Sequence, residues 1–239
     1  NHIVSMHDGN RDVFACVQQL QLLAQQYDLD IRGVIPLSEL AVDVSDMVAA
    51  CLGLPHNPLE LATSRREKGL MKQAVACQGL QVAKFARIAL VDQFQVAMDN
   101  LGFATFPVVV KTPQGFSSTD VYIWQSLEQA ATAVESIVGN LGPDGRPVRQ
   151  ALLEEYIHGT EFAVNLMASH KKIVVTDVWK YVKTDQTRYS SAEICNPNDP
   201  LLKSVVSYAV GAAKAVGVHF GAGHVELKAQ EQADGCYVD

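Results

Sequence analysis

The chain has 239 residues, of which 48% are hydrophobic and 19% are charged, and it carries a formal net charge of −7. This is the composition of an ordinary globular protein, and the acidic balance argues against a general binder of nucleic acid or anionic membranes. No apolar run approaches the roughly 18 residues that a membrane-spanning helix needs. The five cysteines are scattered and odd in number, which indicates reduced thiols in a cytoplasmic protein.

The first sixty residues combine helical and extended patterns. Apolar residues recur at helical spacing over residues 12–27 and 40–52, and an apolar stretch at residues 31–36 predicts a short buried strand between the two helices. Strands that alternate with helices favour a parallel α/β arrangement. Asn57-Pro58 marks a boundary, so residues 1–60 are predicted to form a partial N-terminal α/β domain.

A basic helix is predicted next. It begins at Ser64, where Glu67 completes a capping box, and it ends at Gly79. The helix dipole favours acidic residues in the first turns, yet four basic side chains crowd them: Arg65, Arg66, Lys68 and Lys72. A bound anion would relieve this conflict. The alternative is a basic face that is simply solvated.

A buried strand and a loop of small residues follow. After a helix over residues 92–101, the apolar run from Val108 to Val110 predicts a fully buried strand, with Lys111 at its end. The loop at residues 112–119 is rich in hydroxyls and backbone donors and returns into a strand at residues 120–124. Such a hairpin can fold over a phosphate chain, with Lys111 as the counter-charge. It is not a P-loop, because the lysine precedes the loop, and Gly/Ser hairpins without a ligand are common.

The second half of the chain alternates strands, a polar stretch and a helix. Ser126 caps a helix, and after it an alternating strand at residues 162–167 is followed by an antiparallel return at residues 173–179. Residues 180–199 are polar and irregular, which predicts a long functional loop. Pro200 opens an amphipathic helix.

The last residues predict a β-hairpin with two acidic side chains on one face. Residues 224–229 alternate polar and apolar, so His224, Glu226 and Lys228 share a face, and Asp234-Gly235 is a turn signal. If residues 230–235 form the loop, Glu226 lies directly opposite Asp239. Such carboxylates repel each other unless a cation lies between them, and hard divalent cations prefer carboxylate oxygens. The alternative is a solvated hairpin with two unrelated acids.

Four signals stand in a fixed order along the chain. They are the basic turn Arg66-Glu67-Lys68 with Met71-Lys72, the strand from Pro107 to Lys111 with its Gly/Ser hairpin, the segment from Glu154 to Glu161, and Gly223-His224-Val225-Glu226 running to Asp239. In this order they resemble the ATP-grasp superfamily. Within it they are most similar to the carboxylate–amine ligases, which include bacterial L-amino-acid (dipeptide) ligases and carnosine-synthase-type enzymes.

The resemblance implies a fold and a division of the chain. The expected fold class is α/β, as an α+β two-lobed ATP-grasp with the nucleotide between the lobes. Residues 1–60 would form the partial N-terminal domain, residues 61–155 the linker helices and small lobe, and residues 156–239 the large lobe. Family members usually continue from the second acid to an Asn and an Arg, so the large lobe is expected to be incomplete here. The start at Asn1 likewise suggests a missing N-terminal strand.

The same resemblance implies which residues hold the nucleotide. Lys68 and Lys111 resemble the lysines that contact ATP phosphates, and Ser117 and Ser118 lie in the loop that closes over these phosphates. Glu161 is similar to the acid that accepts hydrogen bonds from the ribose hydroxyls. The hinge that holds adenine through backbone groups and a carboxylate corresponds to Glu154, Glu155, Tyr156 and Ile157.

Magnesium and the catalytic groups are implied in the same way. Glu226 and Asp239 match the two magnesium-ligand positions, and Mn²⁺ could replace Mg²⁺ there. Lys111 is expected to be catalytic as well as nucleotide-binding. His224 either contacts the substrate or the phosphate, as a catalytic residue, or is a structural histidine. Glu67 departs from the family pattern, because Asp or Asn is commoner before the first lysine.

The implied activity is an ATP- and magnesium-dependent ligation. A carboxylate, expected to be an amino acid, attacks the γ-phosphate of ATP to form an acyl phosphate, and an amine then displaces phosphate. The alternatives are another ATP-grasp branch, such as a purine-biosynthetic or carboxylase-type ligase, and a nucleotide-binding pseudoenzyme without catalysis. The expected partners are a small-molecule carboxylate and amine, with no nucleic acid and no membrane, and a homodimer is the candidate oligomer.

Overall fold

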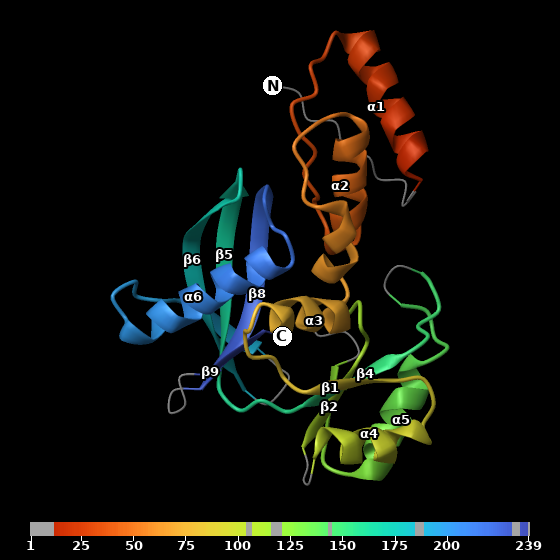
Figure 1. The fold of residues 1–239 in the computed structure, drawn as a ribbon, viewed down its shortest axis with the longest axis vertical. Helices are drawn as coiled ribbons and strands as arrows, with labels where there is room; N and C mark the ends of the chain where they lie inside the picture. The colour runs from red at the N-terminus through yellow and green to blue at the C-terminus, as the bar shows by residue number, and fades with distance from the viewer. Residues whose placement is uncertain are drawn as a thin grey trace.

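The computed structural model describes residues 12–103, 107–115, 121–142, 145–184, 189–230 and 235–238, which form two β-sheets covered by helices (Figure 1). The helices are α1 (Val13–Tyr27), α2 (Val42–Cys51), α3 (Lys68–Cys77), α4 (Gln93–Leu101), α5 (Leu127–Ile137) and α6 (Pro200–Ala215), with 3-10 turns at Glu39–Ala41, Leu59–Leu61 and Thr63–Arg65. None of the described helices is both long enough and apolar enough to span a membrane.

Every strand pairing among the described residues is antiparallel. The small sheet has the order β1-β4-β2-β3, formed by β1 (Phe85–Ile88), β2 (Val108–Lys111), β3 (Val121–Trp124) and β4 (Ala151–Glu155). The large sheet has the order β7-β6-β5-β8-β9, formed by β5 (Thr160–Ser169), β6 (Lys172–Lys183), β7 (Tyr189–Ile194), β8 (Gly221–Gln230) and β9 (Gly235–Val238).

Helices α1 and α2 form a small unit at one end of the molecule (Figure 1). Asp12 caps α1, because its carboxylate accepts hydrogen bonds from the backbone N–H groups of Phe14 and Ala15. Cys16 and Val17 of α1 are buried against Val48 of α2. Both helices were predicted from their apolar spacing, and both are confirmed.

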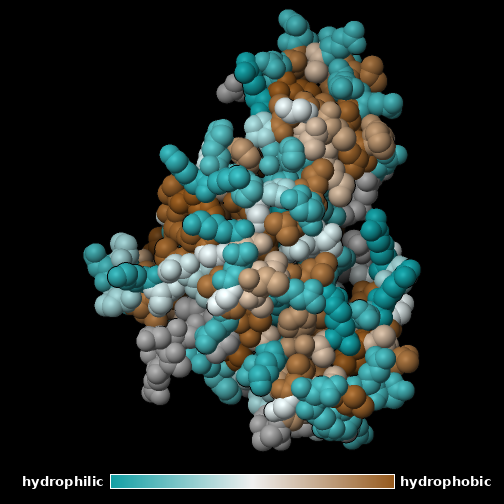
Figure 2. All heavy atoms as spheres, viewed as in Figure 1, coloured by the Kyte–Doolittle hydropathy of each residue, from teal (hydrophilic) through white to brown (hydrophobic). Residues whose placement is uncertain are grey.

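The strand predicted between these helices, at residues 31–36, is absent. Ile35 is 74% exposed and the next apolar residue, Leu37, is 75% exposed; Figure 2 shows hydrophobic residues on the surface of this unit. The prediction was wrong because a strand must satisfy its backbone groups with a neighbouring strand, and no described strand pairs with this stretch. The parallel α/β arrangement that the sequence predicted is also wrong, because the described strands pair only in antiparallel fashion.

Helices α4 and α5 cover one face of the small sheet (Figure 1). Alternate residues of β2 and β4 point into this core, among them Val108, Val110 and Leu153. The intervening residues, which include Lys111 and Glu154, therefore face the opposite side of the sheet. Helix α3 lies on that side (Figure 1).

Helix α3 starts later than predicted, at Lys68 instead of Ser64. Glu67 is itself the N-cap, because its carboxylate accepts hydrogen bonds from the N–H groups of Gly69 and Leu70. An acid at the helix N-terminus complements the helix dipole. The capping-box prediction was wrong because residues 63–65 form a separate 3-10 turn.

The basic residues ahead of α3 have acidic partners within the chain. Arg65 forms an ion pair with Asp46 at 2.9 Å, and Arg66 pairs with Glu39. The charge conflict that suggested a bound anion is therefore relieved by these acids. Arg65 and Arg66 connect the start of α3 to the α2 unit instead of forming an open basic face.

Helix α6 covers one face of the large sheet, and α3 packs against the same core. Val75 of α3, Val164 of β5 and Val205 of α6 are all fully buried in one cluster. The predicted start of α6 at Pro200 is confirmed. The opposite face of the large sheet has no helix over it among the described elements (Figure 1).

The long irregular loop predicted at residues 180–199 is wrong in part. Strand β6 continues to Lys183, and β7 occupies Tyr189–Ile194. Every residue of β7 is exposed, so its sequence has no apolar alternation that would reveal a strand. Pairing with the edge of β6 decides its conformation.

The C-terminal hairpin has the predicted register. Leu227 pairs with Val238, and Gln230 pairs with Gly235. The loop is shorter than predicted, because Gln230 and Gly235 belong to the strands. Asp239, the predicted neighbour of Glu226, lies outside the described residues.

Candidate functional site

A buried ionic cluster joins α3 to the small sheet. The carboxylate oxygen Oε2 of Glu154, on β4, lies 3.0 Å from Nζ of Lys111 on β2 and 3.4 Å from Nζ of Lys72 on α3. All three residues are at most 3% exposed. Among the described residues, the second oxygen of Glu154 has no hydrogen-bond partner. A buried acceptor without a partner is rare and indicates a place for a ligand or water.

The connection from β4 to β5 is held tightly against β8. Nζ of Lys228 donates a hydrogen bond to the carbonyl of Ile157 at 3.3 Å and lies 4.8 Å from the centre of the Tyr156 ring. Gly159 has φ +149, and a Cβ there would lie 2.5 Å from the carbonyl oxygen of Ala229. Only glycine fits such a close approach with this backbone conformation.

Glu161 follows this connection and is 5% exposed. One of its oxygens lies 2.6 Å from Nζ of Lys183, and the other accepts a hydrogen bond from the Tyr189 hydroxyl at 2.7 Å. Nζ of Lys183 also lies 4.7 Å from the centre of the Tyr189 ring. The carboxylate is therefore neutralised and oriented by residues of β6 and β7.

The face of the large sheet away from α6 carries a polar network. Oδ1 of Asp177 accepts hydrogen bonds from Nδ2 of Asn165 at 2.5 Å and from Nε1 of Trp179 at 2.6 Å. Oδ1 of Asn165 lies 2.7 Å from Nδ1 of His224, and Nε2 of His224 lies 3.5 Å from Oε1 of Glu226. Strands β5, β6 and β8 thus present one connected set of polar side chains.

The electrostatics of this network follow from these contacts. The hydrogen bond from Asn165 is the main reason that the pKa of Asp177 is lowered, so this carboxyl stays ionised. The hydrogen bond to Glu226 raises the pKa of His224. Burial, with the nearby charge of Glu226, raises the pKa of Tyr181 to about 12, so its hydroxyl remains a donor to Glu226 at 3.2 Å.

Glu226 suits one position of a divalent metal site. Its side chain is 37% exposed, and carboxylate oxygens are the ligands that Mg²⁺ prefers. In the described part of the chain, no group of three or more His, Cys, Asp or Glu side chains is arranged to hold a metal. Asp239, the predicted second ligand, is not among those residues.

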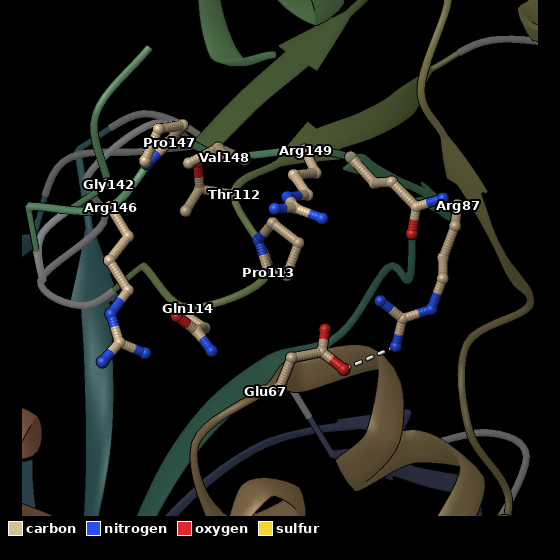
Figure 3. Close-up of a pocket in the computed structure, with 11 residues that line it drawn as sticks. Glu67, Arg87, Thr112, Pro113, Gln114, Gly142, Arg146, Pro147, Val148 and Arg149 are labelled. Atoms are coloured by element: carbon tan, nitrogen blue, oxygen red, sulfur yellow. Dashed lines mark hydrogen bonds and ion pairs between the residues drawn. The ribbon is translucent and has the colours of Figure 1, made fainter. Parts of the chain in front are cut away.

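A cavity of about 250 Å³ lies beside the N-terminus of α3 (Figure 3). Nη2 of Arg87 lies 2.5 Å from Oε2 of Glu67. Figure 3 shows this guanidinium group pointing at Glu67, with Arg146 on the opposite side of the cavity. Arg149 and Thr112 also line it. Guanidinium groups bind carboxylate and phosphate oxygens, so the cavity has the chemistry of an anion site next to the start of the predicted phosphate loop.

The family model for the ATP-grasp domain matches residues 104–239, which is more than half of the chain. The chain belongs to the ATP-grasp family. This match covers β2 to β9, which is the large sheet with the network on its open face and the small sheet without β1. The predicted family is confirmed.

Two curated relatives match most of this chain. Dapdiamide A synthase of Enterobacter agglomerans is 30% identical over 230 residues, 95% of this chain and 51% of the relative. The L-arginine-specific L-amino acid ligase of Bacillus subtilis is 22% identical over 197 residues, 81% of this chain and 47% of the relative. The chain thus spans about half the length of each curated relative.

A solved structure supports the ATP-grasp fold. The L-amino acid ligase from Bacillus licheniformis superimposes with a TM-score of 0.72 at 20% identity, covering 95% of this chain and 52% of that protein. The predicted fold class is therefore confirmed, with antiparallel sheets as its observed form.

The structure brings some of the predicted ATP-grasp site residues together. Lys111 and Glu154 form an ion pair, and His224 lies beside Glu226. The N–H of Lys68 donates to the carbonyl of Pro113 at 2.9 Å, and in the described part of the chain its side chain has no hydrogen bond or ion pair. Ser117 and Ser118 lie outside the described residues.

Sequence reasoning missed Lys72 and the Asn165–Asp177 pair as site residues. Lys72 stands four positions after Lys68, which places both side chains on one face of α3. That spacing was the available signal. Asn165 and Asp177 carry no local signal, because they meet only through the pairing of β5 with β6.

Proposed function

We propose that this protein is an ATP- and magnesium-dependent ligase that joins a carboxylate, an amino acid in this branch of the family, to an amine. The reaction forms an acyl phosphate and releases ADP and phosphate. Both curated relatives are named as synthase or amino acid ligase. The observation that carries the proposal is the buried Lys72–Glu154–Lys111 cluster, because it combines two fixed cations with an unpartnered acceptor at the edge between the two lobes.

In this proposal the small sheet holds the nucleotide. Lys68 and Lys111 contact phosphate oxygens, and the loop with Ser117 and Ser118 covers them and excludes water. The free oxygen of Glu154 accepts a hydrogen bond from the adenine amino group, while the backbone of Glu155, Tyr156 and Ile157 forms the rest of the adenine site. Donors held in fixed positions lower the activation free energy of phosphoryl transfer, because they orient the reacting groups.

Glu161 is proposed to bind the ribose hydroxyls. Both of its oxygens are engaged by Lys183 and Tyr189. Ribose must therefore share or replace one of these contacts. We expect the Tyr189 hydroxyl to be the group replaced, because it is neutral and Lys183 is charged.

Magnesium is proposed to be held by Glu226 and Asp239. When bound, it would neutralise the β- and γ-phosphate oxygens. The chain's own groups orient this site: the Tyr181 hydroxyl donates to Glu226, and Nε2 of His224 faces the same carboxylate. The donor chemistry also suits Mn²⁺.

We also propose that the chain divides into domains at residues 60 and 155. A cytoplasmic location and a homodimer are proposed as well. So is the restriction of partners to small molecules. The relatives are about twice as long as this chain, so the amine and carboxylate pockets are proposed to include parts of those proteins that this chain does not span.

The test is release of ADP by the protein supplied with ATP, Mg²⁺ and pairs of amino acids. ADP should appear only when a carboxylate and an amine are both present, with a product heavier by their condensation. Lys111→Ala should weaken ATP binding measured by calorimetry, whereas Lys203→Ala, an exposed lysine on α6, should not.

Other outcomes would contradict the proposal. ADP release with bicarbonate or a purine-pathway intermediate would assign the protein to another ATP-grasp branch. ATP binding without ADP release for any pair would indicate a pseudoenzyme. An unchanged dissociation constant for Lys111→Ala would remove this lysine from the site.

A further inference from the structure

The buried cluster of Glu154, Lys72 and Lys111 determines which oxygen of the carboxylate is left for a ligand. Nζ of Lys111 lies 3.0 Å from Oε2 of Glu154, and Nζ of Lys72 lies 3.4 Å from the same oxygen. Oε1 of Glu154 is buried and, among the described residues, has no hydrogen-bond partner. The two lysines therefore share one oxygen, and the other oxygen is an acceptor without a partner.

The two lysines reach Glu154 from different elements of the fold. Val109 of β2 pairs directly with Glu154 of β4, so Lys111, two residues further along β2, is a diagonal neighbour of Glu154 on the same face of the sheet. Lys72 comes from α3, which lies over this face (Figure 1). A buried carboxylate that is held by partners on two rigid elements keeps one orientation.

The free oxygen of Glu154 can only accept a hydrogen bond. A carboxylate that lies between two ammonium groups is ionised, and an ionised carboxylate has no hydrogen to donate. A ligand group that donates is therefore bound at Oε1, whereas a group that presents a lone pair leaves this oxygen unsatisfied and repels it. Adenine carries an amino group at position 6, which donates, whereas guanine and hypoxanthine carry an oxygen there, which accepts.

We propose that Lys72 is a positioning residue, which together with Lys111 holds Oε2 of Glu154 and so directs Oε1 at position 6 of the purine. The cluster thereby selects 6-amino over 6-oxo purine nucleotides. This inference rests on the proposed function, because it takes the base of the nucleotide to lie at Glu154. In this arrangement Lys72 does not touch the base and acts only through the carboxylate.

The same geometry predicts how the selectivity can be changed. Glu154→Gln keeps the size of the side chain but gives it one donor end and one acceptor end. The ammonium groups of Lys72 and Lys111 can only donate, so the amide oxygen must take the place of Oε2. The NH₂ group of the amide then takes the place of Oε1. A donor at this position suits an oxygen at position 6 and no longer accepts from an amino group.

The test compares the dissociation constants of ATP and ITP, measured by calorimetry on the full-length protein with Mg²⁺ and without amino acids. The wild type should bind ATP roughly 100-fold more tightly than ITP, because ITP leaves the buried oxygen unpaired. In Glu154→Gln this ratio should fall by about tenfold or more. ITP also carries a hydrogen on N1, but this change is the same for both proteins, so the difference between their ratios reports on position 6.

Lys72→Met tests the positioning role, because it removes the ammonium group and keeps a side chain of similar length. The ratio should fall by about threefold or more, since only Lys111 then holds Oε2. Lys72→Arg keeps a charged donor and should restore most of the ratio. A lysine with a merely structural role would change the melting temperature and weaken both nucleotides equally. Lys203→Met, at an exposed position of α6, is the control and should match the wild type.

Several outcomes would overturn the inference. Equal dissociation constants for ATP and ITP in the wild type, or an unchanged ratio in Glu154→Gln, would show that the cluster does not select the base. An unchanged ratio in a folded Lys72→Met would remove Lys72 from this role. If Lys72→Met does not fold, as judged by circular dichroism, Glu154→Gln decides alone. A wild type that prefers ATP as expected but releases no ADP with any pair of amino acids would overturn the proposed ligase function and leave this inference standing.

Discussion

The Glu154 cluster of the small sheet and the His224–Glu226 pair of the large sheet differ in how far their charged groups are buried. On the small sheet, Glu154 is 3% exposed and lies between two lysines that are no more exposed than the acid. On the large sheet, the side chain of Glu226 is 37% exposed and that of His224 is 49% exposed. A buried charge that loses its partner is strongly destabilising, whereas exposed pairs contribute little to stability. We therefore expect the Glu154 cluster to contribute mainly to stability, whereas Glu226 and His224 are accessible to a ligand.

The largest effect on stability should come from breaking the buried cluster. Glu154→Ala leaves Lys72 and Lys111 without their shared carboxylate, which we expect to cost about 3–5 kcal/mol in the free energy of unfolding. Urea denaturation measures it. Glu135→Ala, an exposed acid on α5, should change stability by no more than about 0.5 kcal/mol. A loss below about 1 kcal/mol for Glu154→Ala would remove the contrast between the sheets.

The open face should respond through activity instead of stability. Removing the charge with Glu226→Gln keeps the size of the side chain, and we expect a loss of roughly 100-fold or more in ATP turnover, since even residues behind a metal ligand contribute 10–100-fold. The unfolding free energy should change by no more than about 0.5 kcal/mol. Glu193→Gln on β7, whose register places it on the other face of the sheet, is the control. If Glu226→Gln turned over ATP at nearly the wild-type rate, the assignment of Glu226 as a metal ligand would be contradicted.

The connection between the sheets should be sensitive to a single methyl group. In Gly159→Ala the Cβ would meet the carbonyl oxygen of Ala229 at 2.5 Å, at φ +149, so we expect a loss of about 1–3 kcal/mol. Thermal unfolding compares it with Gly33→Ala, where no atom lies within 4 Å of the added Cβ. Equal melting temperatures for the two variants would contradict this prediction, because the backbone around Gly159 would then accommodate the added methyl group without cost.

The smallest effect should be a pH dependence that comes from His224. The folded protein raises its pKa above 6.5 through the hydrogen bond to Glu226, so the protonated ring stabilises the fold. This contribution is fully present below the unfolded-state pKa and is lost as the pH rises through the folded-state pKa. The wild type should therefore exceed His224→Gln by about 0.5 kcal/mol or less in acid, and by less in alkali. A larger difference at high pH would reverse the sign and contradict the assignment.

Local signals explain which parts of the fold could be predicted. Helices α4 and α6 could be predicted from their apolar spacing, with Asp92 and Pro200 at their starts. The cap at Ser126 is confirmed, since its hydroxyl accepts a hydrogen bond from the N–H of Gln129. The strand that ends at Lys111 follows from a continuous apolar run. These features depend on neighbours within a few residues, so the sequence contains them directly.

The errors share one physical cause. Residues 31–36 look like a strand but have no described neighbour to pair with, whereas the exposed polar stretch Tyr189–Ile194 is a strand because it pairs with β6. Backbone pairing is a property of two segments, and composition of one segment does not determine it.

The sequence by itself determined the family, the order of the site segments and the register of the last hairpin, since alternation and a turn signal restrict that register. Only the tertiary structure decided that Lys72 meets Glu154 and Lys111, and that Asn165 links Asp177 to His224. These contacts join residues of separate elements. Their geometry depends on how α3 packs on the small sheet and how β5, β6 and β8 align, which no local pattern encodes.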